Sequence, residues 1–142
     1  MNRILCQSVY AGQLQFTRAI FNLFAANQDD HSKNWSFIQA DDGRWSPAPF
    51  YDVTYNPNAM NEHTTSFLGF GKKPPRETIQ KLAEDAGFAN WEQARICIQK
   101  IVDALSYFPK LAQEISVSKT IQKEIEQTLT ERRKSNAVLF ER

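Results

Sequence analysis

The chain has 142 residues, 42% of them hydrophobic, which is enough for one domain with an apolar core. Its 17 basic and 16 acidic side chains nearly cancel, so no overall field favours nucleic acid or an anionic membrane. No apolar run approaches the roughly 20 residues that a membrane-spanning helix needs, and the N-terminal stretch has too short an apolar core for a signal peptide. Cys6 and Cys97 are far apart and fit no metal-ligand or Cys-x-x-Cys pattern, which favours reduced thiols. These features predict a cytoplasmic protein.

The first predicted helix covers residues 13–26. Its apolar side chains recur at helical spacing, which places one stripe against a core: Leu14, Phe16, Ala19, Ile20, Leu23 and Phe24. The stripe stops at Asn27, where the polar stretch NQDDHSKN begins. A polar stretch after a helix is either a solvated helix end or a reaction centre.

A short β-hairpin is predicted next. Aromatic and polar residues alternate over 35–37, Asp42-Gly43 is typical of a turn, and residues 44–46 can return as the second strand. Two prolines follow and end the hairpin, because proline has no N–H to donate to a ladder. Residues 56–62 are then expected to form a loop.

Helices are predicted for most of the remaining chain. One covers residues 76–86, with Gly87 after its end, and the next begins at the capping residue Asn90. Pro109 is expected to kink or end that second helix. Ser118 resembles a further N-cap.

The pattern as a whole predicts a mainly α fold with one short β-hairpin. We find no internal repeat and no clear boundary, so residues 1–142 are expected to form one domain. Residues 135–142 are expected to fray, as chain ends often do.

Three polar residues suggest phosphoryl transfer. Such a reaction needs a carboxylate for the attacking hydroxyl and oxygen ligands for magnesium on the nucleotide phosphates. Protein kinases supply both from one loop, as Asp-x-x-x-x-Asn, and Asp29 and Asn34 stand at that offset. A second metal carboxylate normally follows a short strand pair, where Asp52 lies. Each residue alone also fits a capping or turn role.

The stretches NQDDHSKNWSF and GRWSPAPFYDVTYNP resemble the C-terminal part of HipA-type serine/threonine kinases, the toxins of bacterial toxin–antitoxin pairs. The later stretches HTTSFLGFGKKPPRETIQKLAEDAGF and DALSYFPKLAQEISVS are similar to the loop and helices that follow in that family. The resemblance is most specific over residues 22–57. It implies a helical domain like a kinase C-lobe, with the hairpin after the catalytic loop.

The resemblance also implies roles for single residues. Asp29 would be the catalytic base, and Asn34 and Asp52 would bind Mg²⁺. The ATP site would be lined by His31, Ser32, Lys33, Asn34, Tyr51 and Asp52. No chemistry is implied for Asp30, and His63, away from this cluster, is expected to be structural.

A kinase also needs an N-lobe with a glycine-rich loop, and this sequence shows no such loop. The segment GFGKKPP follows no buried strand and lacks the Gly-Lys-Ser/Thr of a P-loop. We therefore expect a C-lobe that is inactive without an N-lobe. It would be a fragment, half of a split kinase whose N-lobe is another polypeptide, or a degenerate relative.

The expected partners follow from the same resemblance. A kinase would act on a protein with a serine or threonine acceptor. The alternative is a non-catalytic interaction module that binds an antitoxin or another partner protein. Direct DNA contact is not expected, because the helix over residues 76–86 ends in Glu84 and Asp85.

Overall fold

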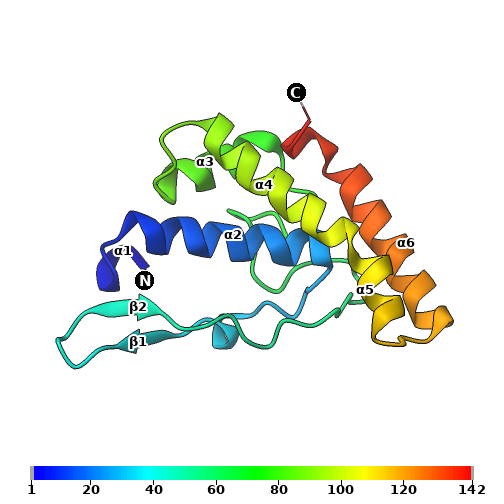
Figure 1. Ribbon diagram of the computed structural model, residues 1–142. Helices are drawn as coiled ribbons and strands as arrows, with labels where there is room; N and C mark the ends of the chain where they lie inside the picture. Colours follow the sequence, from blue (N-terminus) through cyan, green and yellow to red (C-terminus); the bar gives the residue numbers. More distant parts are fainter. Residues whose placement is uncertain (1, 142) are drawn as a thin grey trace.

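The computed structural model describes residues 2–141 and is mainly helical with one small hairpin (Figure 1). Its elements in chain order are α1 (Asn2–Leu5), α2 (Val9–Ala25), the 3₁₀ turn η1 (Ser32–Asn34), β1 (Phe37–Gln39), β2 (Trp45–Pro47), α3 (Arg76–Asp85), α4 (Trp91–Ser106), α5 (Phe108–Glu114), α6 (Lys119–Ser135) and the 3₁₀ turn η2 (Ala137–Leu139). The long helix α2 runs through the middle of the molecule. The hairpin lies on one side of it, and α3 and α4 lie on the other. The predicted fold class is confirmed.

Helices α2, α4 and α6 begin at residues whose side chains cap them. Asn90 accepts a hydrogen bond from the Gln93 amide at 3.0 Å, and Ser118 accepts one from the Ile121 amide at 3.4 Å, as the sequence predicts. Helix α2 begins at Val9, four residues earlier than predicted, because Ser8 caps it through the Ala11 amide at 3.4 Å. Side-chain caps satisfy backbone N–H groups that a helix start leaves unpaired.

The core forms where α2 packs against α4, α6 and α3. Four residues of the predicted stripe, Phe16, Ile20, Leu23 and Phe24, are buried there, whereas Ala19 is partly buried against this core and Leu14 is only half-buried outside it. The other fully or nearly fully buried members of the core include Ile79, Ala83, Ala94, Ile98 and Leu139. Gly12 permits the close approach of α2 to the end of α3. A Cβ at this position would lie 2.5 Å from the carbonyl oxygen of Ala86, too close for any side chain.

The hairpin is antiparallel, with Phe37 opposite Pro47 and Gln39 opposite Trp45. Gly43 lies in the connecting turn with a φ of 82°, a conformation that glycine adopts without strain. The first strand begins at Phe37 instead of residue 35. Trp35 is held out of the ladder because its indole N–H donates to the carbonyl oxygen of Asp30 at 3.2 Å.

The chain end differs from the expected frayed tail. Leu139 is fully buried and Phe140 is only 4% exposed, and both belong to the core. The Phe140 ring packs edge-on against Phe24 of α2 at 5.9 Å, and its carbonyl oxygen accepts a hydrogen bond from Arg95 at 2.9 Å. Leu139 and Phe140 therefore hold this end of the chain against the core, and residue 142 lies outside the described residues.

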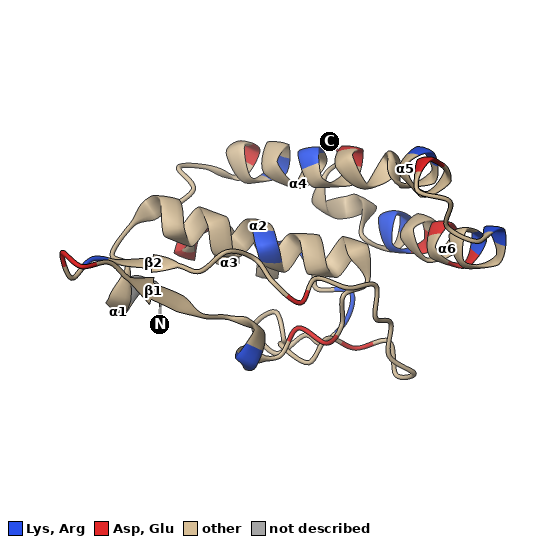
Figure 2. Ribbon diagram, turned by 60° about the horizontal axis from the view of Figure 1, so that its bottom comes forward, with Lys and Arg blue, Asp and Glu red and all other residues tan. Residues whose placement is uncertain are grey.

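Charged side chains of both signs are distributed along the chain. Figure 2 shows both signs of charge along α6 and at the hairpin tip. Within residues 2–141, no helix is both long enough and apolar enough to cross a membrane.

Candidate functional site

The loop after α2 begins at Ala26, whose left-handed backbone conformation, with a φ of 54°, ends the helix. The next two residues, Asn27 and Gln28, are buried. Asn27 donates a side-chain hydrogen bond to Asn22 at 3.0 Å. The backbone also pairs with Asn56, since Gln28 N donates to Asn56 O and Asn56 N donates to Ala26 O, each at 3.1 Å. The loop is therefore anchored at its start.

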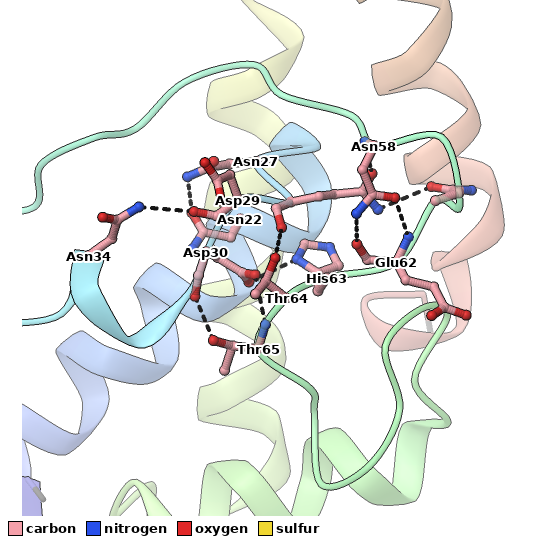
Figure 3. Close-up of polar contacts among 12 residues, drawn as sticks. Asn22, Asn27, Asp29, Asp30, Asn34, Asn58, Glu62, His63, Thr64 and Thr65 are labelled. Atoms are coloured by element: carbon pink, nitrogen blue, oxygen red, sulfur yellow. Dashed lines mark hydrogen bonds and ion pairs between the residues drawn. The ribbon is translucent and has the colours of Figure 1, made fainter.

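Asp29 and Asn34 come together in this loop (Figure 3), and His31 lies beside Asp29. Asp29 is exposed, whereas Gln28 before it and Asp30 after it are buried. His31 Nε2 lies 3.6 Å from Asp29 Oδ1. The Asn34 side-chain amide donates to the backbone carbonyl oxygen of Asp29 at 2.9 Å. This bond closes the loop and leaves the Asp29 carboxylate facing solvent.

Arg18 of α2 fixes the segment that follows β2. Its guanidinium donates to the carbonyl oxygen of Ala48 at 2.7 Å and lies over the Phe50 ring, 5.2 Å from the centroid. Burial lowers the pKa of the Arg18 side chain, and the nearby Tyr10 acts in the opposite direction. An arginine so held keeps its charge at neutral pH, because its usual pKa is far above 7. Arg18 thus holds the start of the segment that leads to Asp52.

A second contact ties that segment to the loop. The Tyr51 hydroxyl donates to the carbonyl oxygen of Lys33 at 2.7 Å. Asp52 comes directly after Tyr51, is exposed, and has a φ of 53°, a left-handed conformation that Asp adopts more readily than most residues. Among the described residues, no hydrogen bond or ion pair joins Asp52 to Asp29 or Asn34. The two segments meet through Tyr51 and Lys33.

The predicted metal ligands offer oxygen atoms alone. In the part of the chain that is described, no group of three or more His, Cys, Asp or Glu side chains could hold a metal ion. Asn34 and Asp52 supply one amide and one carboxylate, and Mg²⁺ sites commonly add water and substrate phosphate oxygens to such a set. His31 Nδ1 is buried and accepts or donates no hydrogen bond within residues 2–141. An amide oxygen and a carboxylate are donors of the kind that Mg²⁺ accepts.

A groove of about 810 Å³ opens beside this loop, between the first half of α2, the approach to β1 and the end of α3. Ser32 and Asp30 line it, but Asp29, Asn34 and Asp52 do not. Most of its walls are apolar and include Phe16, Trp35, Phe37, Phe67 and Leu82. Of the predicted ATP-site residues, Ser32 alone lines this groove. The groove is therefore largely separate from the predicted ATP site.

The sequence did not indicate which residues form hydrogen bonds to the buried side of this loop. His63, expected to lie away from the cluster, contacts Asp30, with its Nδ1 2.9 Å from Asp30 Oδ2. Gln28 bonds through its side chain to Asn61 at 3.2 Å and to the Asn58 amide at 2.9 Å. More than 25 residues separate these partners in the sequence, so no local spacing signals the contacts.

Comparison with known proteins identifies a family. The model of the HipA-like C-terminal domain family matches residues 3–108, which include α2, the loop, the hairpin and α3. No curated protein matches the chain.

Proposed function

This chain belongs to the family of HipA-like C-terminal domains, and we propose that it is the C-lobe of a serine/threonine protein kinase. It supplies the catalytic base and the magnesium ligands for phosphoryl transfer from ATP. An N-lobe, on the same or a separate polypeptide, covers the adenine and completes the enzyme. The domain alone is inactive or nearly so, because the adenine contacts provide much of the binding surface for ATP.

The proposal gives the loop residues distinct chemical roles. Asp29 orients the acceptor hydroxyl and takes its proton, as the hydroxyl oxygen bonds to the γ-phosphorus and ADP leaves. Asn34 and Asp52 would hold Mg²⁺, which would supply positive charge beside the phosphates. His31, Ser32, Lys33 and Tyr51 line the phosphate side of the site.

One observation carries the proposal. Asp29 is exposed while both of its neighbours are buried, and its own carbonyl oxygen is bonded to Asn34 at 2.9 Å. A solvated helix end has no need to hold one carboxylate outward between two buried residues. A reactive carboxylate does need this, because the reaction depends on its position to within about an ångström.

Binding of Mn²⁺ in place of Mg²⁺ tests the metal site on the chain as it is. In ¹H–¹⁵N spectra, Mn²⁺ with ADP is expected to broaden the amide signals of Asn34 and Asp52 more than those of α6. Asp52→Asn removes a carboxylate ligand and is expected to abolish this selective broadening. Asp42→Asn removes a carboxylate at the hairpin tip and serves as the matched control. Equal broadening in the wild type and Asp52→Asn would contradict the proposal.

A non-catalytic module that binds an antitoxin or another partner protein is the second candidate. The groove of about 810 Å³ favours it, because its walls are largely apolar and exclude Asp29, Asn34 and Asp52. This function requires partner binding that survives Asp29→Asn and Asp52→Asn, together with no selective Mn²⁺ broadening.

A further inference from the structure

A buried carboxylate–imidazole pair lies directly behind the proposed catalytic base. Asp30 is 3% exposed and His63 is 5% exposed, and Asp30 Oδ2 lies 2.9 Å from His63 Nδ1 (Figure 3). The two residues belong to different loops, 33 positions apart. Neither has a task in the phosphoryl transfer described above.

Asp30 is held by its other oxygen atoms as well. Its Oδ1 accepts a hydrogen bond from the Thr65 amide at 3.0 Å, and its backbone carbonyl oxygen accepts one from the Thr65 hydroxyl at 2.5 Å. The same carbonyl accepts the indole N–H of Trp35 at 3.2 Å. A buried carboxylate is costly unless its oxygens are bonded, and here both are. Asp30 is therefore fixed in one position.

Because Asp29 directly precedes Asp30 in the chain, the bonds of Asp30 restrain the backbone of Asp29 from one side. On the other side of Asp29, the Gln28 carbonyl oxygen accepts two hydrogen bonds from Thr64, at 3.1 Å from the amide and 2.9 Å from the hydroxyl. Both residues that flank the base are thus bonded to the loop that carries Thr64 and Thr65. Since the flanking backbone is fixed, Asp29 keeps mainly the freedom of its own side-chain torsions.

His63 has one polar partner in this arrangement. Its side chain is fully buried and packs edge-on against the Phe67 ring, with centroids 5.4 Å apart. Its Nε2 is buried and makes no hydrogen bond to any group of residues 2–141. An ionised carboxylate can only accept, so Nδ1 donates to Asp30. An apolar residue would fill the same space, and the imidazole adds one directed bond to Asp30.

We propose that Asp30 and His63 are positioning residues, which hold the loop so that Asp29 meets the acceptor hydroxyl. This inference rests on the proposed kinase function. His63→Leu removes the donor and keeps an apolar side chain, whereas His63→Asn keeps an amide donor near the place of Nδ1. The pair of variants separates a positioning bond from simple filling of the core.

The kinetic test uses the chain together with a HipA-type N-lobe, at a temperature well below each variant's melting point. His63→Leu is expected to lower kcat by about 10- to 100-fold and to leave the KM for ATP within about threefold. His63→Asn is expected to recover most of the lost kcat. Asp42→Asn, whose carboxylate pairs with Arg44 at the exposed hairpin tip, is the control and is expected to match the wild type. A folded His63→Leu variant with wild-type kcat, or equal loss in both His63 variants, would overturn the inference.

An NMR readout separates failure of this inference from failure of the proposed function. If the wild type transfers no phosphoryl group, the kinase proposal fails, and the amide signals of Asp29 and His31 still report the position of the loop. Those signals are expected to shift in His63→Leu and to return toward wild type in His63→Asn. If they stay in place, the positioning role is wrong. Should His63→Leu fail to fold, Thr65→Val removes the hydroxyl bond to Asp30 and is expected to shift the same signals.

Discussion

The side-chain amide of Asn34 donates a hydrogen bond to the backbone carbonyl oxygen of Asp29 at 2.9 Å. The bond links the two residues that stand five positions apart in the loop after α2. It uses the nitrogen of the Asn34 side chain, so the oxygen of the same amide is available to a metal ion. One side chain can therefore shape the loop and serve as a ligand.

Substitution of Asn34 can separate these two tasks. Asn34→Ala removes both the oxygen ligand and the bond to Asp29, and we expect Mn²⁺–ADP affinity to fall roughly tenfold. Asn34→Asp keeps an oxygen ligand but cannot donate to Asp29, so it is expected to retain the affinity. Calorimetric titration measures both, with Gln39→Ala in the hairpin as the control. Equal loss of affinity in both Asn34 variants would show that the oxygen is not a ligand.

Gly12 is expected to be intolerant of alanine. In a helix alanine is ordinarily more stable than glycine by about 1 kcal/mol, so propensity alone predicts a gain. The Cβ would lie 2.5 Å from the Ala86 carbonyl oxygen, and we expect Gly12→Ala to lower the free energy of unfolding by about 1–3 kcal/mol. Gly71→Ala is the matched control, because its nearest contact is an ordinary 3.5 Å. Denaturant unfolding compares the two, and a stabilised Gly12→Ala would contradict the packing of α2 against the end of α3.

Arg132 is expected to stabilise the loop that carries His63. This arginine of α6 is 7% exposed and donates to the Asn61 side-chain oxygen, which also accepts from Gln28. Burial lowers the pKa of Arg132, and Glu131 and Tyr55 act in the opposite direction. Arg132→Ala is expected to cost about 2 kcal/mol, the value of a hydrogen bond to a charged group.

The matched control for Arg132 lies two residues away. Lys134 is an exposed basic residue of the same helix, and Lys134→Ala is expected to change stability by less than about 0.5 kcal/mol. Thermal unfolding of both variants measures the difference. Similar melting temperatures would mean that the bond from α6 to Asn61 contributes little.

The chain end offers a test of the core. Leu139 is fully buried and Val138 beside it is 52% exposed. We expect Leu139→Ala to destabilise the fold by about 2–5 kcal/mol, because it leaves a cavity among packed side chains. Val138→Ala is expected to have a small effect. If both variants unfold at the same denaturant concentration, residues 137–140 do not belong to the core.

Local patterns in the sequence were enough for the helices and the hairpin. The stripe of α2, the caps at Asn90 and Ser118, and the turn at Gly43 each depend on residues within a few positions, and the structure has all of them except the burial of Leu14 in the stripe. The burial of Leu139 and Phe140 was not predicted. Two apolar residues at a chain end carry no periodicity, and their place depends on the core formed by α2 and α4.

The candidate site also combines residues that local sequence patterns predict with contacts that they do not. Asp29 and Asn34 could be recognised because their spacing is local, and Asp52 because of the motif around it. The contact of Asp30 with His63 joins residues 33 positions apart across two loops, and the tie between Tyr51 and Lys33 spans 18. Such contacts depend on how the loops fold over one another, which no spacing within either loop expresses.

Phosphoryl transfer by Asp29 tests the central claim most directly. The chain is combined with a HipA-type N-lobe, magnesium and γ-labelled ATP, and label incorporated into protein serine or threonine is measured. The account predicts transfer by the wild type and by Asp41→Asn, a control in the exposed hairpin turn. It predicts a loss of at least about 100-fold in Asp29→Asn, because the base is gone. Equal incorporation by the wild type and Asp29→Asn would contradict the assignment of this loop as a catalytic centre.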